Sequence, residues 1–587
     1  MFANIVSPAD FSQSASSRSP PYNHPVSNQL SNPLSSAVQT VSLISLGCPK
    51  NLVDSEKMLG LLAESGLAPI SYDADSEGFG GADAVVVNTC GFLEASKDES
   101  LAVIKEAISA KERGEVKRVI VAGCLVQRHR AKMLEWAPGI DAMIGVFDRD
   151  KIVEAVSGGL PIGTDRPRSA MEASPDKPPY WIAANALMAA KERGMNTTGL
   201  TVNGKDGSGI GYFEDDSARM RLTPRHYGYL RISEGCNQNC AFCTIPSIRG
   251  KMRSKPLDRI VREARELLTD GAHELLLIGQ DTTSYGDDIG FGLNYDGKFG
   301  GGLPALLNAL SDTVEQTTGA GWLRLMYAYP TNFSGPIVDA FAKLSSKGHL
   351  LKYLDIPLQH ASNSVLKSMR RHVTREQQET LIETMREKIP GMAIRTTFIS
   401  GFPGETENDH EQLIDFVETM QFDALGVFEY SHEPGTVAGT MEDDPKLAVP
   451  PEVKKRRRDE VMALQQRIAF EQAEYLAQQF DENKPTTTGV QFDIIIDEAM
   501  KSKGMKTTGV SDGGRLYKGR TYFQAPQIDA TTFVQSKEAL SPGEVVRCTI
   551  VGSDGYDLVA KPVGTLEKKI GLKVISASSK TKAGQCS

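Results

Sequence analysis

The sequence predicts an α/β protein with three folded parts: a parallel sheet covered by helices, a full or partial α/β barrel, and a small carboxy-terminal β-barrel. Two long regions alternate between short apolar β-rich runs and helical runs, which is typical of parallel sheets. The last folded region contains only short β runs, which suits a small barrel. A chain of 587 residues is long enough for three or four domains.

The first folded region, residues 41–159, is predicted to form the parallel-sheet domain. Its expected strands are residues 41–46, 84–87, 119–121 and 143–146. Its expected helices include residues 54–62 and 94–111. Because strands and helices alternate, the strands should lie parallel, with helices covering them.

The second region, residues 225–467, is predicted to form the α/β barrel. Its expected strands are residues 227–232, 274–278, 323–326, 353–356, 393–398 and 425–428. Its expected helices are residues 256–270, 303–314, 364–369, 375–388 and 405–419. A charged helix at 452–478 then leads into the small barrel, which with its leading helix is assigned to residues 468–565. The barrel's β runs are residues 492–496, 532–534 and 544–550.

Three segments outside these regions carry no strong periodic pattern. Residues 1–40 are rich in Ser, Pro, Asn and Gln, with Arg18 as the only Lys or Arg. They favour a disordered tail over the alternative, a Ser-rich transit peptide. Residues 160–224 are interpreted as a linker or insertion with a short helix at 182–193. Residues 566–587 form a basic, lysine-rich tail.

Composition limits the function classes. The net charge of -9 argues against a chain built as a general polyanion binder. No apolar run approaches the roughly 18 residues of a membrane helix, so no membrane partner is expected. The eight cysteines come without a secretion signal, which indicates a reducing, cytoplasmic compartment. In such a compartment, clustered cysteines more often hold metal than pair as disulfides.

The strongest motif is a C-x3-C-x2-C triplet formed by Cys236, Cys240 and Cys243. It directly follows the predicted strand at 227–232, and barrel enzymes place their chemistry in such loops. Three thiolates can hold a four-iron cluster that keeps one iron open. That iron could chelate the amino and carboxylate groups of S-adenosylmethionine, which would make this triplet the catalytic centre.

Zinc binding and chance are the alternatives for this triplet. Structural zinc usually takes four protein ligands, and the nearest spare imidazole, His226, would sit at the far end of the preceding strand. Chance is disfavoured because six of the eight cysteines fall into two plausible sites. The other two, Cys548 and Cys586, have no partner cysteines in the sequence pattern and are not expected to bind metal.

Neighbouring motifs suggest a cofactor pocket at the same rim. Phe242 lies between two of the thiols and is interpreted both as a core aromatic and as a shield for the cluster or adenine ring. Gly401 and Gly404 form a glycine turn that is either purely steric or lets a ligand approach the backbone. Gln280 and Asp281 end a predicted strand. They could bind cofactor and substrate respectively, or merely cap the turn that follows.

Three dispersed cysteines point to a second cluster. Cys48, Cys90 and Cys124 each follow a predicted strand of the first domain, and a glycine adjoins each of them. The carboxyl ends of parallel strands share one edge of a sheet, so the three thiols should converge there. Ordinary buried cysteines are the alternative, because cysteine is common in cores. The repeated placement favours a second three-thiolate metal site.

These motifs resemble the methylthiotransferase family of radical S-adenosylmethionine enzymes, over nearly all of residues 41–562. The matching segments are residues 45–56, 88–92, 233–236, 245–250, 279–286, 327–330, 355–361 and 401–405. The closest likeness is to the branch that modifies a ribosomal protein. Transfer-RNA relatives typically carry Gln-Met-Asn after the first cysteine and Gln-Asn-Val-Asn after the second core strand. Here those places hold residues 49–51, Pro-Lys-Asn, and residues 280–283, Gln-Asp-Thr-Thr.

The resemblance implies a radical core, a carboxy-terminal TRAM domain, two [4Fe–4S] clusters and S-adenosylmethionine. It implies β-methylthiolation of an aspartate in the twelfth small-subunit ribosomal protein, with electrons from a donor such as flavodoxin. The first forty residues, the long 160–224 segment and the basic tail depart from the family pattern. None of them contains a cysteine of either triplet.

The sequence leaves two other functions as alternatives. The runner-up is methylthiolation of adenosine in transfer RNA. An electron carrier or RNA-binding module without catalysis is a different class, but a carrier leaves the large barrel and its glycine turn unexplained. Acidic and basic residues nearly cancel between residues 486 and 560, whereas RNA modules tend to be clearly basic.

Overall fold

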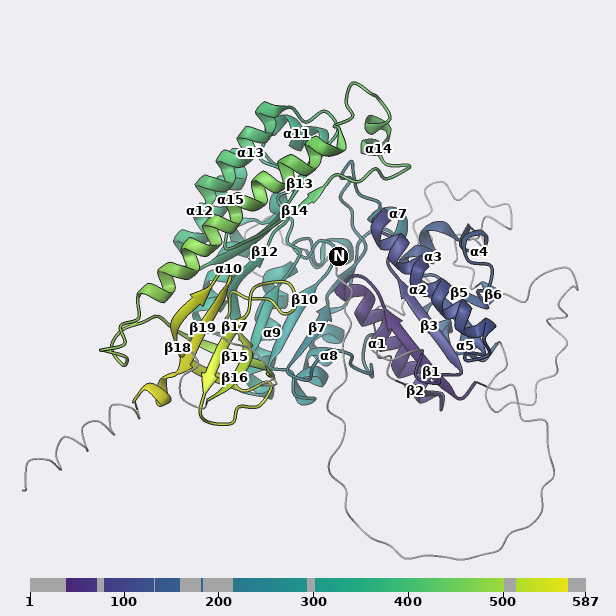
Figure 1. Cartoon of the computed structure of the whole chain (residues 1–587), viewed down its shortest axis with the longest axis horizontal. Helices are drawn as coiled ribbons and strands as arrows, with labels where there is room; N and C mark the ends of the chain where they lie inside the picture. Colours follow the sequence, from purple (N-terminus) through teal and green to yellow (C-terminus); the bar gives the residue numbers. More distant parts are fainter. Residues whose placement is uncertain are drawn as a thin grey trace, which may run out of the picture. The chain divides into compact units, whose positions relative to one another are not determined.

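The computed structural model describes residues 38–70, 79–130, 132–158, 181–182, 215–292, 301–500 and 514–567 (Figure 1). The chain forms two compact units. The first comprises the described residues up to Thr223 together with Ser247–Lys251, a short segment from much later in the chain. The second comprises Pro224–Pro246 and the described residues from Met252 onward.

The first unit is built on a parallel sheet of order β2-β1-β3-β4-β5-β6. The strands are β1 Thr40–Ser45, β2 Ala68–Ile70, β3 Ala84–Thr89, β4 Arg118–Gly123, β5 Ala142–Ile144 and β6 Trp181–Ile182. The helices are α1 Pro49–Glu64, α2 Glu94–Glu112, α3 Cys124–His129, α4 Lys132–Trp136 and α5 Ile152–Ser157. The predicted parallel-sheet domain is confirmed.

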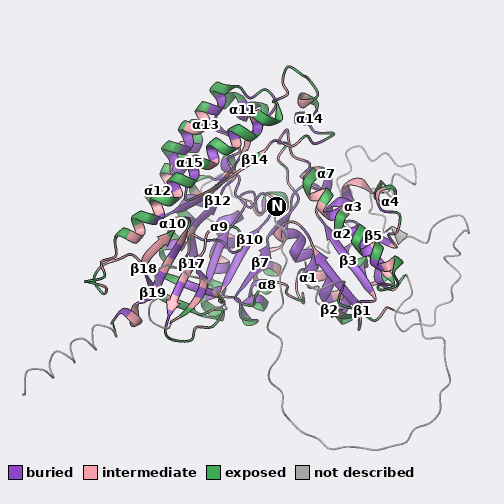
Figure 2. Ribbon diagram, viewed as in Figure 1, coloured by how far each residue is buried: buried purple, intermediate pink, exposed green. Residues whose placement is uncertain are grey.

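Both faces of this sheet are covered, because side chains alternate along each strand. Val85 and Val87 of β3 pack in a core with Ile104 of α2, while Val86 packs in a second core with Met58 of α1. The strands read as nearly continuous apolar runs for this reason. In Figure 2 they are buried, whereas the helices keep an exposed side.

Two sequence predictions in the first unit need correction. Helix α1 begins at Pro49, not at Asp54, because Pro49 occupies the first helical turn, where its fixed φ suits a helix start. The predicted helix at 182–193 is wrong at its first residue, since Ile182 pairs with Met143 as an edge strand. Its other residues lie outside the described part of the chain.

The end of the expected 160–224 linker packs on α1. The Glu56 carboxylate accepts hydrogen bonds from the backbone N–H groups of Leu222 at 2.9 Å and Thr223 at 3.3 Å. Lys57 donates to the carbonyl of Ser217 at 2.8 Å. Residues 215–223 are therefore an ordered part of the first unit.

The second unit contains a six-stranded parallel sheet of order β14-β13-β12-β11-β10-β7. The strands are β7 Tyr227–Arg231, β10 Glu274–Ile278, β11 Trp322–Leu325, β12 Leu350–Asp355, β13 Ala393–Ser400 and β14 Ala424–Glu429; a short pair, β8 Ser233–Glu234 and β9 Arg253–Ser254, lies apart. The six strands form an open sheet with β14 and β7 at its two edges, so the barrel is partial.

The helices of this sheet largely follow the prediction. They are α8 Leu257–Thr269, α9 Gly302–Thr317, α10 Gly335–Ser346, α11 Asn363–Ser368, α12 Arg375–Lys388, α13 Glu407–Met420, α14 Val437–Glu442 and α15 Pro451–Gln478. The residues of α7, Ile245–Arg249, are divided between the two units. The sequence prediction missed α10, which starts with Gly-Pro. Helix α13 begins at Glu407, two residues later than predicted, because Thr406 caps it and Glu405 folds back into the preceding turn.

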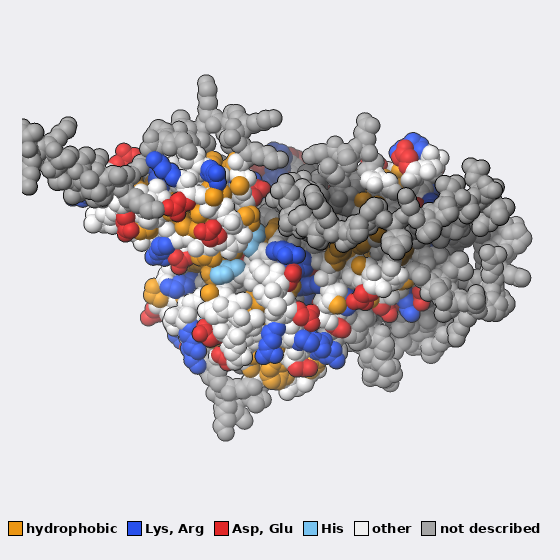
Figure 3. Space-filling model, turned by 90° about the horizontal axis from the view of Figure 1, so that it is seen from below, with side chains coloured by type: hydrophobic (Ala, Val, Ile, Leu, Met, Phe, Trp, Pro, Cys, Tyr) orange, Lys and Arg blue, Asp and Glu red, His pale blue; other side chains and the backbone are white. Residues whose placement is uncertain are grey.

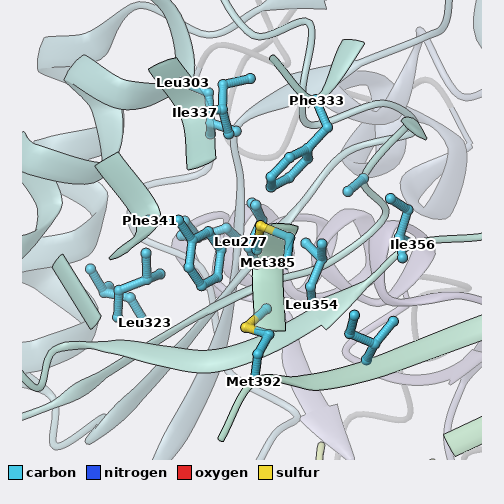
Figure 4. Close-up of a cluster of buried hydrophobic side chains, with 14 of the residues drawn as sticks. Leu277, Leu303, Leu323, Phe333, Ile337, Phe341, Leu354, Ile356, Met385 and Met392 are labelled. Carbon is cyan, nitrogen blue, oxygen red and sulfur yellow. The ribbon is translucent and has the colours of Figure 1, made fainter. Parts of the chain in front are cut away.

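Strands and helices of the sheet share one apolar core. Figure 4 shows Leu323 of β11, Leu354 of β12, Phe341 of α10 and Met385 of α12 within this cluster. Each of these side chains is at most 1% exposed. Burying one such side chain contributes about 1.5–3 kcal/mol. The core fixes the carboxyl ends of the strands, where the candidate site lies.

The last part of the second unit is a closed five-stranded barrel of order β15-β16-β17-β19-β18. Its strands are β15 Gln491–Ala499, β16 Arg515–Arg520, β17 Thr532–Ser536, β18 Val545–Asp554 and β19 Asp557–Pro562. The predicted small barrel is confirmed, although β16 and β19 were not foreseen. Cys548 lies in its apolar core.

Surface charge and helix composition give two further observations. On the face shown in Figure 3, Lys and Arg side chains are interspersed with Asp and Glu side chains. Within the described ranges, no helix combines the length and apolarity that crossing a membrane requires.

Candidate functional site

Three cysteines of the first unit meet at the carboxyl ends of neighbouring strands. Cys48 follows β1 and caps α1, Cys90 follows β3, and Cys124 follows β4 and opens α3. Strands β1, β3 and β4 are adjacent in the sheet, so their ends share an edge. A Cβ added at Gly91, beside Cys90, would lie 2.9 Å from the carbonyl carbon of Cys124, so these two loops are in close contact. The charge of a Cys48 thiolate would raise the pKa of both Cys90 and Cys124.

Glycine allows these loops to approach one another. A Cβ added at Gly47 would lie 2.8 Å from the Cβ of Cys90 and 3.2 Å from its Sγ. Gly47 has a φ of 98° and Gly123 a φ of 96°, backbone conformations that favour glycine. The glycines beside the cysteines therefore have a steric role in bringing the loops together.

Asn51 holds two of the cysteine loops in place. Its side-chain amide donates to the carbonyls of Leu46 at 2.6 Å, Thr89 at 3.2 Å and Asn88 at 3.3 Å. Leu46 directly follows β1, and Asn88 and Thr89 are the last two residues of β3, just before Cys90. A buried amide with three acceptors is a rigid brace for both turns.

A buried arginine lies beside these thiols. Burial raises the pKa of Cys124 to about 12, and the nearby Arg249 guanidinium acts in the opposite direction. Burial and Cys48 raise the pKa of Cys90, and Arg249 again opposes them. Metals bind cysteine as thiolate, so a cation favours the binding form. Sequence reasoning gave Arg249 no role, although it lies within the family motif at 245–250.

The second unit carries the cysteine triplet in the loop after β7 and β8. The backbone N–H of Gln238 donates to the Cys236 Sγ at 3.4 Å, and that of Ile245 donates to the Cys243 Sγ at 3.5 Å. Burial raises the pKa of both thiols to about 12. Two of the three sulfurs thus receive backbone hydrogen bonds, as is typical of iron–sulfur ligands.

Arg371 and Tyr329 join the triplet, and sequence reasoning missed both as site residues. The Arg371 Nη1 lies 3.8 Å from the Cys240 Sγ, and its guanidinium stacks over the Tyr329 ring at 4.2 Å. Nη2 donates to the carbonyl of Pro357 at 2.6 Å. Tyr329 belongs to the family motif at 327–330, but nothing local to Arg371 indicated that it reaches a cysteine.

Gln280 and Asp281 follow the carboxyl end of β10, at the same edge of the sheet as the triplet that follows β7. Asp281 accepts hydrogen bonds from Thr283, Ser284 and the side chain of Gln238, the last at 2.9 Å. These are the turn-capping contacts, and Gln238 extends them to the cysteine loop. Gln280 donates to Glu234 at 2.8 Å, which in turn pairs with Arg231 at 2.9 Å. Both side chains brace the loop that holds the triplet.

The turn at 401–405 is shaped by its last residue. The Glu405 carboxylate accepts from the backbone N–H groups of Gly401 at 2.7 Å and Phe402 at 2.9 Å, and Arg457 pairs with it at 3.0 Å. Gly401 has a φ of 74°, and an added Cβ would lie 2.2 Å from the Lys454 Cγ. The space above Gly401 thus belongs to the Lys454 side chain.

Two other proposed pocket residues lie nearby. Gly404 has a φ of 84°, and an added Cβ would meet the Leu447 side chain at 3.5 Å. Phe242 is half-buried against an apolar cluster that includes Phe402 and Tyr430. Phe242 therefore packs as a core aromatic and keeps part of its ring accessible.

The donor set of each trio fits an iron–sulfur cluster. Among the described side chains, no three of His, Cys, Asp or Glu are grouped so as to hold one metal ion. A four-iron cluster takes each thiolate on a separate iron, so its ligands stand further apart than the ligands of a single zinc ion. Three thiols, a nearby cation and backbone donors to sulfur suit such a cluster.

Comparison with known proteins agrees with this arrangement. Residues 40–145 match the model of "Uncharacterized protein family UPF0004", residues 230–417 match the radical SAM superfamily, and residues 488–563 match the TRAM domain. The chain is 35% identical to a ribosomal protein uS12 methylthiotransferase RimO of Desulforamulus reducens over 523 residues, which are 89% of this chain and 99% of that protein.

Two further relatives with the same name give a similar result. One from Lachnoclostridium phytofermentans is 38% identical over 88% of this chain and 99% of its own. One from Koribacter versatilis is 36% identical over 89% of this chain and 96% of its own. Near-complete coverage at this identity, with all three domains present, establishes kinship. The chain belongs to the RimO family of radical S-adenosylmethionine methylthiotransferases.

Proposed function

We propose that the protein methylthiolates the β-carbon of an aspartate in ribosomal protein uS12, giving 3-methylthioaspartate. The observation that carries this proposal is that one chain contains a cysteine trio in each unit and also the RimO-type segment at 280–283. Its relatives are named for action on uS12. In the net reaction the β-carbon loses one hydrogen and gains one methylthio group.

The triplet Cys236, Cys240 and Cys243 is the proposed site of the radical cluster. A [4Fe–4S] cluster bound there with S-adenosylmethionine would supply a 5′-deoxyadenosyl radical able to abstract hydrogen from an unactivated carbon. The chain's part is to hold the ligand loop still. Asp281 does so through Gln238, and Arg371 compensates negative charge at Cys240.

Cys48, Cys90 and Cys124 are the proposed site of a second [4Fe–4S] cluster, which would provide the sulfur. Their support is geometric: three buried or half-buried thiols, braced by Asn51, with Arg249 beside them. A thiol trio with three protein ligands leaves one iron for an exogenous sulfur species. The electron for each cycle is proposed to come from a reduced carrier such as flavodoxin.

A transfer-RNA adenosine is the alternative substrate. Between residues 486 and 560 the TRAM region has nearly balanced charge, so it lacks the cationic surplus that gives phosphate affinity. A neutral region is better suited to a basic ribosomal protein. A ribosomal substrate and the cysteine usage also support a cytoplasmic location.

The proposal is tested by incubating reconstituted enzyme with S-adenosylmethionine, sulfide, reductant and either uS12 or transfer RNA. The expected product is uS12 heavier by about 46 Da, which is one methylthio group in place of hydrogen. A uS12 variant with the target Asp changed to Asn serves as the control and should stay unmodified. Methylthiolated adenosine with unmodified uS12 would establish the alternative.

A further inference from the structure

Arg249 is a buried cation in contact with the amino-terminal thiols. It is 2% exposed and belongs to Ser247–Lys251, which packs as part of the first unit. Its guanidinium hydrogen-bonds the Cys124 thiol, and its charge also acts on Cys90.

The residues that anchor Arg249 also shape the cysteine loops. Its Nη1 and Nη2 each lie 3.4 Å from the Asp54 Oδ2, and Nη2 lies 3.4 Å from the Asn51 Oδ1. Asn51 is the brace that ties the ends of β1 and β3 together. Arg249 therefore rests on the same support that positions Cys48 and Cys90.

These contacts are long for charge-assisted hydrogen bonds, which usually measure about 2.7–2.9 Å. A second arginine makes the shorter pairs with the same carboxylate. The Arg149 Nη1 lies 3.0 Å from the Asp54 Oδ1 and 2.7 Å from the Asp216 carboxylate. Arg149 pairs with two carboxylates. Arg249 shares one of them, Asp54, and its charge also acts on the thiols.

A four-iron cluster on three thiolates carries net negative charge, which grows by one on reduction. Nearby positive charge and hydrogen bonds to sulfur stabilise the reduced form and raise the reduction potential. A guanidinium also favours retention of the cluster, because it offsets the repulsion among three buried thiolates.

We infer that Arg249 is a positioning residue for the amino-terminal cluster, which it holds through Cys124 and whose reduction potential it raises. This inference rests on the second cluster proposed above. Arg249 is also the sixth residue after Cys243, so a single short peptide carries a ligand of the radical triplet and the cation of the other trio.

The test uses the full chain with Cys236, Cys240 and Cys243 changed to Ala, so that only the amino-terminal cluster is observed. R249Q, R249K or R149Q is added to this parent, and each protein is reconstituted anaerobically. The signal of the reduced cluster is then followed by electron paramagnetic resonance as a function of the applied potential. Iron loss to a chelator is followed in parallel. R149Q is the matched control, because Arg149 is equally buried and shares Asp54.

R249Q is expected to shift the midpoint potential to more negative values and to lose iron about tenfold faster than the parent. R249K, which keeps the charge, should stay near the parent potential, and R149Q should shift it less than R249Q. An R249Q cluster with the parent's potential and iron retention would overturn the inference. If R249Q does not fold, a negative shift in the charge-retaining R249K would overturn it. A parent without iron would instead refute the second cluster itself.

Discussion

Glu274 on β10 and Arg520 on β16 form a buried ion pair with an N···O distance of 2.6 Å. The other carboxylate oxygen of Glu274 pairs with Arg324 on β11, also at 2.6 Å. One fully buried carboxylate therefore joins the small barrel to two strands of the parallel sheet. His226 and Asp497 extend the contact, since their side chains lie 2.8 Å apart.

The first prediction concerns this junction. E274Q should lower the free energy of unfolding of the second unit by about 3–5 kcal/mol, because it removes the charge that two buried guanidinium groups share and leaves Arg520 only its pair with Asp497. Urea denaturation of the full chain measures the change. R467A is the control: Arg467 and Glu418 form an exposed pair, so its loss should cost under about 1 kcal/mol. Equal effects of the two variants would contradict this assignment.

The second prediction follows from the pKa of Glu274. Burial alone would raise it, but Arg324 and Arg520 hold it below its usual value of 4.5. A carboxyl whose pKa is lower in the folded state stabilises the fold above its unfolded pKa, and the gain is lost as pH falls through the folded value. The stability difference between the natural chain and E274Q should therefore be full at pH 7 and shrink below about pH 4.5. A difference that stays constant down to pH 3 would contradict the coupling.

Iron content tests the number of clusters. Anaerobically reconstituted protein should carry about eight irons, four for each cysteine trio. Changing Cys48, Cys90 and Cys124 to Ala should halve that number. C548A is the matched control, because Cys548 is buried in the small barrel and should leave the iron content unchanged. Undiminished iron in the triple variant would remove the amino-terminal cluster from the mechanism.

Cleavage of S-adenosylmethionine separates the two sites. With Cys236, Cys240 and Cys243 changed to Ala, no 5′-deoxyadenosine should form under reducing conditions, because the radical cluster has lost its ligands. With the amino-terminal trio changed, cleavage should persist while methylthio transfer to uS12 stops. Chromatography of the nucleoside products gives the first readout and mass spectrometry of uS12 the second. Equal cleavage by both variants would falsify the division of labour.

Arg371 should matter for cleavage through its contact with Cys240. R371Q removes a cation 3.8 Å from the sulfur and its stacking on Tyr329, so we expect about a tenfold slower cleavage of S-adenosylmethionine. R371K keeps the charge and should recover part of the rate. Iron content after reconstitution shows whether the loss reflects the cluster itself. Unchanged rates in R371Q would show that the arginine is only structural.

Much of the site was predictable because it depends on local order along the chain. Cys48, Cys90 and Cys124 each follow a strand, and parallel strands bring their carboxyl ends to one edge whatever the loops contain. Arg249 was not predictable in the same way. Its partner Asp54 lies 195 residues earlier, and no periodic pattern encodes such a pairing.

The errors in the fold prediction have similar physical causes. Helix α10 was missed because Gly335 and Pro336, which resemble a turn, occupy its first turn, where proline is tolerated. Ile182 became an edge strand because it pairs with Met143, a partner that the alanine-rich, helix-favouring sequence at 183–190 does not reveal. Glu405 was placed in a helix, although its carboxylate turns back to the backbone of Gly401.

The discontinuity of the first unit has a consequence for its biosynthesis. On the ribosome, a domain usually folds once its own residues have emerged, amino-terminal domains first. Here the described strands of the first unit all precede Ser247–Lys251, which begins 24 residues after Thr223. The first unit therefore cannot be completed until the first residues of the second unit, Pro224–Pro246, have also been translated, because Arg249 follows them in the chain. A truncated gene product ending near residue 223 would lack Ser247–Lys251, and with it Arg249, so it would not contain the whole cluster domain.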